Sequence, residues 1–145
     1  MIELIHVADL VITVAAPIEV GSRRLIPITG GQAQGPRLRG HILAAGADFQ
    51  TSRTDGVTEL EARYVLQTDE GARIYIENRG LRHGPADAME KLQRGEAVDP
   101  ALLYFRTTPR FETAVPAYQW LTRHVFVGVG ARFPDRVELA IYQVM

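Results

Sequence analysis

The segment 57–82 contains the sequence pattern that most constrains the fold. A three-residue loop, Asp69-Glu70-Gly71, with Gly71 in the left-handed conformation, fixes one register for a β-hairpin. In this register the apolar side chains gather on one face and opposite charges meet across the other. The predicted cross-strand pairs are Leu66 with Ile74, Tyr64 with Ile76, Ala62 with Asn78, Gln67 with Arg73, Val65 with Tyr75, Arg63 with Glu77 and Glu61 with Arg79. The pattern therefore predicts an antiparallel pair with one buried and one solvated face.

The rest of the chain is also dominated by strand patterns. Glycines at 30, 31 and 35 with Pro36 predict a loop or bulged turn, and Pro109 predicts a break in a strand. Residues 85–94, between Pro85 and Gly95, are the only helix candidate. About eight short strands and one short helix predict an all-β fold, a closed antiparallel β-barrel or a sandwich, as a single domain over 1–145. The other predicted strands are 3–14, 23–28, 37–45, 102–108 with a continuation at 111–115, 123–131 and 137–144.

Two glycines of the last predicted hairpin raise the question of a pocket. Gly128 and Gly130 share a strand face with His124 and Phe126. If this face is inward, the missing side chains either leave a ligand pocket or make room for a neighbouring aromatic ring or for strand coiling. Both interpretations stay open at this point.

Composition excludes several classes of function. The 16 basic and 17 acidic residues give a net charge of −1, which disfavours a nucleic-acid-binding domain. The chain has no cysteine, and its four histidines lack metal-ligand spacing, so we expect no metal and no cofactor. We expect no membrane span and no secretory signal, which makes the cytoplasm the predicted location.

Several short motifs occur in one order along the whole chain and together resemble a known family. The similarity identifies the chain as a member of domain-of-unknown-function family 3237, also called uncharacterised protein family 0311. The resemblance implies a single-domain, calycin-like β-barrel. A few fungal relatives resemble cyclases that close an oxygen ring by adding a hydroxyl across an alkene. The motifs are Gly30-Gly31-Gln32-Ala33-Gln34-Gly35-Pro36-Arg37-Leu38-Arg39-Gly40, Gly46-Ala47-Asp48-Phe49-Gln50, Arg53-Thr54-Asp55-Gly56-Val57, Ala62-Arg63-Tyr64-Val65-Leu66, Thr68-Asp69-Glu70-Gly71, Tyr104-Phe105-Arg106-Thr107, Phe111-Glu112-Thr113 and Tyr118-Gln119-Trp120-Leu121.

Three charged residues are candidates for catalysis. Asp48 follows a Gly-Ala turn, where it serves either as a general base with a raised pKa or as an Asx-turn cap of a strand. Arg53 forks onto Asp48 or a ligand, or it stays solvated while Asp55 serves its own turn. Glu112 is a second acid/base candidate, and it forms either a structural pair or a site with Arg106.

Aromatic and polar side chains are candidates for ligand binding. Tyr64 and Asn78 fall on the inward face of the predicted hairpin, where they orient a ligand or bond to each other or to water. Tyr104 and Arg106 share a strand face. Tyr118 and Trp120 share a face if their segment is extended, and they either line a pocket or plug the barrel.

Three functional hypotheses follow. The first is a barrel that binds a small, partly apolar or aromatic molecule. The second is a cofactor-free cyclase or isomerase that uses a carboxylate as acid/base. The third is a structural or interaction module without a ligand. We also expect a homo-oligomer, a dimer, formed through an outer apolar strip of Val11, Ile26, Ile28 or Leu103.

Overall fold

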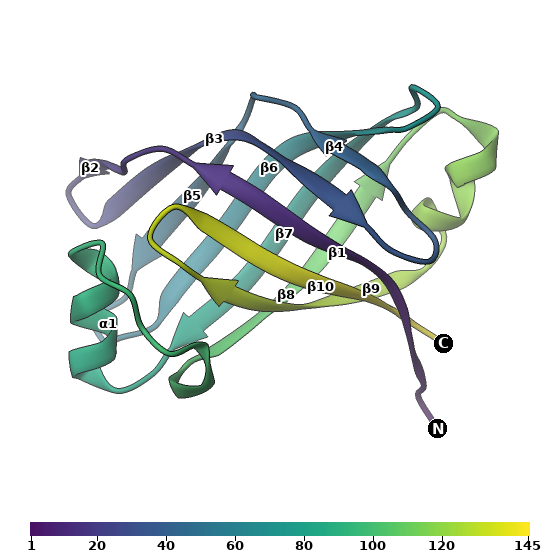
Figure 1. Cartoon of the computed structure of the whole chain (residues 1–145). Coiled ribbons are helices and arrows are strands. Elements are labelled where there is room, and N and C mark those ends of the chain that lie inside the picture. Colours follow the sequence, from purple (N-terminus) through teal and green to yellow (C-terminus); the bar gives the residue numbers. More distant parts are fainter.

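The computed structural model describes all residues, 1–145, and consists mainly of antiparallel strands (Figure 1). The strands are β1 (Leu4–Val14), β2 (Ile18–Val20), β3 (Arg23–Gln34), β4 (Gly40–Ile42), β5 (Ala47–Ser52), β6 (Thr58–Thr68), β7 (Arg73–His83), β8 (Tyr104–Glu112), β9 (Val125–Arg132) and β10 (Arg136–Val144). The helices are α1 (Ala86–Gln93) and two short 3-10 helices, η1 (Pro100–Leu102) and η2 (Pro116–Thr122).

The strands close into a barrel because β1 pairs with both β3 and β10. Strands β1 and β2 pair with successive parts of β3 and share one position in the ring. Strands β4 and β5 likewise share the position between β3 and β6. The ten strands therefore occupy eight positions around a closed antiparallel β-barrel, as the sequence predicts.

The predicted hairpin is confirmed pair by pair. Strands β6 and β7 place Leu66 opposite Ile74, Tyr64 opposite Ile76 and Ala62 opposite Asn78. Gly71 has a φ of 93°, the left-handed conformation that its loop requires. The even-numbered residues of β7 are inward and buried, apart from half-buried Gly80, because successive side chains of a strand alternate between its faces.

One predicted break is shifted along the chain and another is wrong. Strand β3 continues through Gly30 and Gly31, whose φ values of 149° and 143° accompany a register shift in the β1–β3 ladder, and the predicted turn falls at Gly35 and Pro36, after the strand has ended at Gln34. Strand β8 passes through Pro109 because β9 pairs only with Arg106 and Thr107, so no ladder needs the missing N–H on that side. The strand expected over 37–45 shortens to β4.

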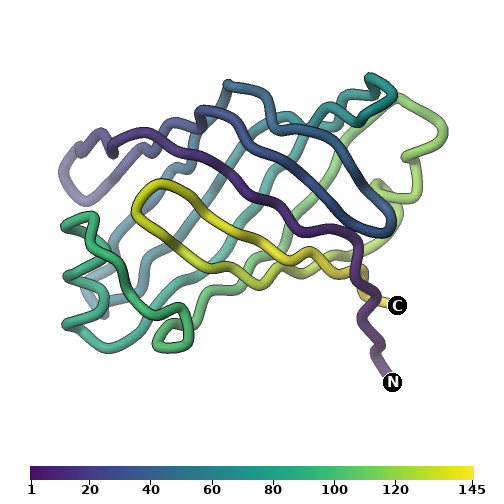
Figure 2. Tube along the Cα trace, viewed as in Figure 1, coloured from purple at the N-terminus to yellow at the C-terminus, as the bar shows by residue number.

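The two ends of the barrel differ in chemistry. The η2 end holds much of the apolar core, which includes Leu66, Ile74, Phe111, Leu121 and Phe126. Helix α1 lies at the opposite end, and the two termini run side by side (Figures 1 and 2). The amide of Met145 donates to the carbonyl oxygen of Glu3 at 2.9 Å. Neither α1 nor the 3-10 helices have the length and apolar character that a membrane-crossing helix needs.

Candidate functional site

A group of buried polar side chains lies inside the barrel. The strands place them there by alternation, since each follows or precedes an outward residue. We call this group the interior polar cluster: Asp48 and Gln50 of β5, Tyr64 of β6, Asn78 and Arg82 of β7, Thr107 of β8 and Arg132 of β9.

Most of these side chains lack a full set of protein partners. Nε2 of Gln50 donates a hydrogen bond of 2.8 Å to Oδ2 of Asp48. Buried polar atoms are otherwise almost always paired, so each unpaired atom calls for a partner from outside the chain. The buried atoms without a protein partner are Oδ1 of Asp48, the hydroxyl of Tyr64, Oδ1 of Asn78, Nε and Nη1 of Arg82 and Oγ1 of Thr107.

A small cavity connects four members of the cluster. Its volume is about 40 Å³, and Asp48, Tyr64, Asn78 and Thr107 line it. Apolar side chains form the remaining wall: Ile12, Val14, Ile26, Ile28, Leu60, Ala62, Phe105, Val137 and Leu139. The space holds about three water molecules or a group of similar size. Ligand pockets of drug-sized molecules are larger, about 300–1,000 Å³, so most of the bore is filled by side chains.

Burial shifts the acid–base properties of the cluster. Desolvation raises the pKa of the Asp48 carboxyl, against the opposing effects of the Gln50 hydrogen bond and the charge of Arg82. Burial and the nearby Asp48 also raise the pKa of the Tyr64 hydroxyl. Desolvation lowers the pKa of Arg82 to about 10. Asp48 is therefore an interior carboxyl with a raised pKa, and its Asx-turn alternative does not apply.

The two glycines of β9 accommodate neighbours and do not hollow the barrel. A Cβ atom on Gly130 would lie 2.7 Å from the ring of Phe105, and one on Gly128 would meet the hydroxyl of Thr107. Both glycines face inward beside Phe126, as predicted. Of the two interpretations, the structure supports the one in which a glycine receives an aromatic ring.

The other two candidate catalytic residues do not join Asp48. Arg53 follows β5 at an exposed turn, where Nε donates to Oδ1 of Asp55 at 3.1 Å. The same Oδ1 accepts the amide of Val57 at 3.2 Å, so Asp55 serves its own turn. Glu112 lies on the outer face of β8. The predicted buried pair of Arg106 with Glu112 is wrong, because both side chains point outward from the same strand.

Tyr118 and Trp120 lie at the apolar end of the barrel, away from the interior polar cluster. Their segment is the 3-10 helix η2 and not an extended strand, so the predicted shared face is wrong. The hydroxyl of Tyr118 donates to Glu70 at 2.7 Å. Trp120 packs against the core, and the guanidinium carbon of Arg37 lies 4.0 Å from its ring centroid. Trp120 and its neighbours therefore plug the barrel.

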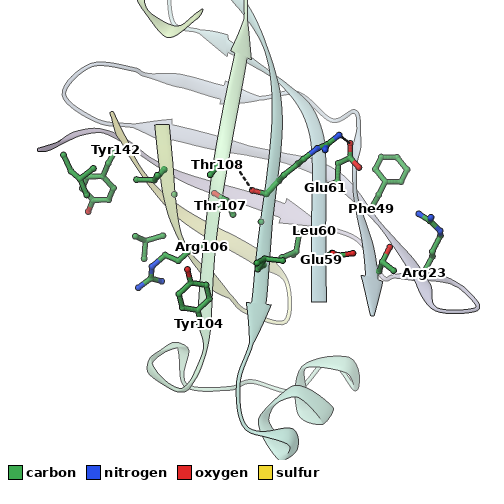
Figure 3. Close-up of a pocket in the computed structure, with 18 residues that line it drawn as sticks. Arg23, Phe49, Glu59, Leu60, Glu61, Tyr104, Arg106, Thr107, Thr108 and Tyr142 are labelled. Carbon is green, nitrogen blue, oxygen red and sulfur yellow. Dashed lines mark hydrogen bonds and ion pairs between the residues drawn. The ribbon is translucent and has the colours of Figure 1, made fainter. Parts of the chain in front are cut away.

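Tyr104 and Arg106 lie on the outer surface and line an open groove, which we call the outer groove (Figure 3). Its volume is about 1,010 Å³, and Glu61, Arg79, Phe49 and Gly128 contribute to the lining. Some of the charges that face it are paired, as in the 3.2 Å contact of Arg79 with Glu61, whereas Arg23 and Arg106 have no carboxylate within 4.0 Å. Apart from Thr107, which also lines the cavity, no residue with an unpaired buried atom lines the outer groove.

Four members of the interior polar cluster escaped the sequence analysis: Gln50, Arg82, Thr107 and Arg132. The sequence does contain a signal for Arg82, because the hairpin register that places Asn78 inward also places Arg82 inward four residues later. Gln50 follows from Asp48 in the same way. Arg132 follows Phe126, Gly128 and Gly130 on the same face of β9, so alternation along the strand also places it, whereas Thr107 depends on how β8 pairs with its neighbours.

The outer strip expected for self-association is partly wrong. Ile26 and Ile28 are buried in the barrel, because β3 turns them inward. Val11 is exposed and Leu103 is half-buried. Association into a dimer stays a prediction.

Fold and site together define a closed antiparallel β-barrel whose core contains an incompletely paired polar cluster. No group of three acidic or histidine side chains is placed to hold a metal ion.

Residues 2–144 match the family described as "Protein of unknown function (DUF3237)", and the chain belongs to this family. A UPF0311 protein of Rhodopseudomonas palustris is 51% identical over 134 residues, which cover 92% of this chain and 88% of the relative. A UPF0311 protein of Clostridium acetobutylicum is 44% identical, with 96% and 92% covered.

Solved structures show the same barrel. The crystal structure of a conserved protein of unknown function from Rhodopseudomonas palustris has a TM-score of 0.97 at 46% identity, and covers 100% of this chain and 98% of the other. A "beta-barrel like protein" from Acinetobacter baumannii has a TM-score of 0.87 at 39% identity, with 100% and 97% covered. An enzyme from Penicillium herquei shares the fold, with a TM-score of 0.73 at 20% identity. The match covers 99% of this chain and 95% of the other.

Proposed function

We propose that this protein binds a small organic molecule inside its barrel, at the interior polar cluster. The observation that carries the proposal is the set of buried, unpaired polar atoms around one cavity. Leaving a buried donor or acceptor without a partner costs about 1–3 kcal/mol for each group. A fold that keeps several such atoms together gains most from a ligand that supplies the missing hydrogen bonds.

The dimensions of the cavity limit the ligand. About 40 Å³ admits a few non-hydrogen atoms, and the wall is mainly apolar. The ligand therefore places a compact polar group among Asp48, Asn78 and Thr107. A larger apolar or aromatic body requires that the side chains between the cavity and the α1 end move apart.

A thermal-shift screen with small metabolites tests this proposal. Ligands that raise the melting temperature of the wild type should lose their effect in Thr107→Val, which removes the hydroxyl and keeps the shape. Thr108→Val is the matched control, because Thr108 is the next residue of β8 and points outward. A stabilising ligand that is insensitive to Thr107→Val and sensitive to Thr108→Val would place binding in the outer groove and refute the proposal.

Acid–base catalysis at the same site is a second candidate function. Asp48 favours it, since burial raises the pKa of its carboxyl toward the range useful for proton transfer, and its Oδ1 has no protein partner. Tyr64 supplies an unpaired hydroxyl in the same cavity to orient the substrate. A cofactor-free cyclase or isomerase needs this combination of a proton-transferring group and an orienting donor.

Proton exchange tests the catalytic candidate without a known product. Each ligand from the screen is incubated with the protein in deuterium oxide, and its carbon-bound protons are followed by NMR. Catalysis predicts exchange that is faster than in buffer and is lost in Asp48→Asn. Binding without any exchange, for every ligand found, supports a binding protein and rejects Asp48 as a base.

We further propose self-association, most simply as a dimer. The outer face carries several exposed apolar side chains, among them Phe49, Leu81 and Val129. Light scattering after size-exclusion chromatography measures the mass directly. A mass of 16.1 kDa at all concentrations would leave the chain a monomer.

A further inference from the structure

Two arginines, Arg82 and Arg132, lie near the carboxyl of Asp48, and a third, Arg24, lies near both of them at the α1 end of the barrel. Arg82 comes from β7, Arg132 from the end of β9 and Arg24 from β3. Arg82 is 4% exposed, Arg132 is 9% exposed, and the side chain of Arg24 is 14% exposed. Asp48 is the only buried acidic residue of the chain. Arg24 is paired with Glu19, so Arg82 and Arg132 together face the one buried negative charge of Asp48.

No acidic side chain neutralises the two most buried arginines directly. Neither Arg82 nor Arg132 has a carboxylate oxygen within 4.0 Å, although the more distant charge of Asp48 raises the pKa of both, against the larger effect of desolvation. Arg24 lies 3.3 Å from Glu19, which is itself exposed. A buried cation without a close counter-charge is costly, and the remedy is an anion or a full set of acceptors.

The hydrogen bonds of the arginines show which one is available to a ligand. Nη1 of Arg132 donates to the carbonyl oxygens of Phe133 at 2.6 Å and Arg136 at 3.2 Å, which fixes that side chain. Nη2 of Arg24 donates to the carbonyl oxygen of Gln93 at 3.4 Å, which ties it to α1. Arg24 also has a buried Nε without a hydrogen bond, but this atom lies 3.3 Å from Oε1 of Glu19, whereas both Nε and Nη1 of Arg82 lack an acceptor and no carboxylate lies close to them.

We propose that Arg82 binds the oxyanion of the ligand and that this ligand is a small hydroxylated organic carboxylate. The inference rests on the binding function proposed above and names its ligand class. Guanidinium groups bind carboxylates well, and Arg132 and Arg24 add positive potential at the same end. Oδ1 of Asp48 and Oδ1 of Asn78 are unpaired acceptors, so the ligand offers them a hydroxyl donor.

The small space favours a carboxylate over a phosphate. The cavity of about 40 Å³ is lined by Asp48, Tyr64, Asn78 and Thr107 but not by Arg82, so an oxyanion on Arg82 must enter the packed interior beside the cavity. A planar carboxylate has three non-hydrogen atoms, whereas a tetrahedral phosphate has five and a higher charge to desolvate. The carboxylate is therefore the oxyanion that this end of the barrel accommodates with the smaller displacement of side chains.

Matched pairs of carboxylates and amides test the inference. The probes are glycolate, lactate and 4-hydroxybenzoate, each with its neutral amide, together with inorganic phosphate. Binding is measured by ligand-detected NMR, and the Nε–Hε signal of Arg82 in ¹⁵N-labelled protein reports the contact itself. The variant Arg82→Met removes the donors and keeps the bulk, Arg82→Lys keeps the charge, and Arg110→Gln is the control on the outer face of β8.

The expected result has three parts. At least one carboxylate binds tenfold or more tightly than its amide. The binding of this carboxylate shifts the Arg82 Nε–Hε signal. The binding is lost in Arg82→Met and is kept in Arg110→Gln. The wild-type signal keeps the test decisive if a variant fails to fold. Equal binding of carboxylates and amides, or tighter binding of phosphate, overturns the ligand class but leaves the binding function intact. Binding of no small molecule, in this series or in the thermal-shift screen, overturns both.

Discussion

Gln50 and Asp48 lie two residues apart on β5, and Nε2 of Gln50 donates a 2.8 Å hydrogen bond to Oδ2 of Asp48 inside the barrel. This bond lowers the pKa of the carboxyl, but desolvation outweighs it and the pKa is raised above its ordinary value of 3.8. The folded state therefore holds a proton on Asp48 more tightly than the unfolded chain does. The contribution of Asp48 to the free energy of unfolding is complete below pH 3.8 and is lost as the pH rises through the raised pKa.

The variant Asp48→Asn tests this direction, because an amide cannot ionise. We expect the free energy of unfolding of Asp48→Asn, minus that of the wild type, to increase as the pH rises from 4 toward 8. Urea unfolding at a series of pH values measures this difference. A difference that stays constant or decreases with pH would show that Asp48 is ionised in the folded barrel at its ordinary pKa.

Asp55 supplies a control of opposite sign. Its pKa is lowered by the hydrogen bond from Arg53, so its stabilising contribution is present above pH 3.8 and is lost as the pH falls. Asp55→Asn should therefore become less stable relative to the wild type as the pH rises through the lowered pKa toward 3.8, and this difference should stay constant above that pH. Opposite slopes for the two variants would separate the interior carboxyl from the turn carboxyl.

The hydroxyl of Tyr64 gives a second prediction. It is buried without a protein partner, so Tyr64→Phe removes a desolvated group and breaks no hydrogen bond within the chain. We expect the free energy of unfolding to rise by about 1 kcal/mol. Tyr118→Phe is the comparison, because it removes the 2.7 Å bond to Glu70 and should lower stability slightly. A loss of stability in Tyr64→Phe would mean that its hydroxyl is already satisfied in the ligand-free protein.

The sequence predicts the barrel better than the site, for a physical reason. The register of β6 with β7 follows from one short loop and from local alternation, and this register correctly turns Tyr64 and Asn78 inward. Barrel closure and the position of Thr107 depend on pairing between strands that are separated in the chain, whereas Arg132 belongs to the local β9–β10 hairpin. For Tyr118 and Trp120, the alternative that they plug the barrel agrees with the structure, although their segment is a Pro-initiated 3-10 helix and not extended.

The close approach of Gly130 to Phe105 gives a third prediction. A methyl group on Gly130 would lie 2.7 Å from the aromatic ring, which a packed core relieves only by moving the ring or the strand. Gly130→Ala should therefore lower the free energy of unfolding by about 2 kcal/mol. In a Phe105→Leu background, Gly130→Ala should lower the free energy of unfolding by less than it does in the wild type. The difference between the two losses is the coupling energy of the pair, about 0.5–3 kcal/mol for residues in contact. Additive effects in this double-mutant cycle would exclude the contact as the cause.

Arg37 and Trp120 give a fourth prediction at the apolar end. The guanidinium carbon of Arg37 lies 4.0 Å from the indole centroid, and Arg37 also bonds to Gln143. Arg37→Met should cost about 1 kcal/mol and shift the emission of Trp120, the only tryptophan of the chain. Arg39→Met is the matched control, since Arg39 is exposed and makes only a 4.0 Å contact with Asp69. Unchanged emission in Arg37→Met would show that the cation does not sit over the ring in solution.

The seam between β8 and β9 gives the last prediction. This ladder has two residue pairs, Arg106 with Val129 and Thr107 with Gly128, whereas β6 and β7 form ten. Local opening requires the least free energy where the fewest ladder bonds and packed contacts must break. In hydrogen exchange, we expect the amides of residues 108–112 that point away from β7 to exchange faster than their neighbours that point toward it.

The seam also matters for access to the interior, because Phe105 and Thr107 of β8 line the cavity. Opening between β8 and β9 would bring a ligand to these side chains without unfolding the β6–β7 hairpin. A ligand that binds inside should therefore slow exchange on β8 and leave the slow amides of β6 unchanged. Uniform exchange rates along β8, with and without ligand, would show that the barrel opens elsewhere, with the α1 end as the remaining route.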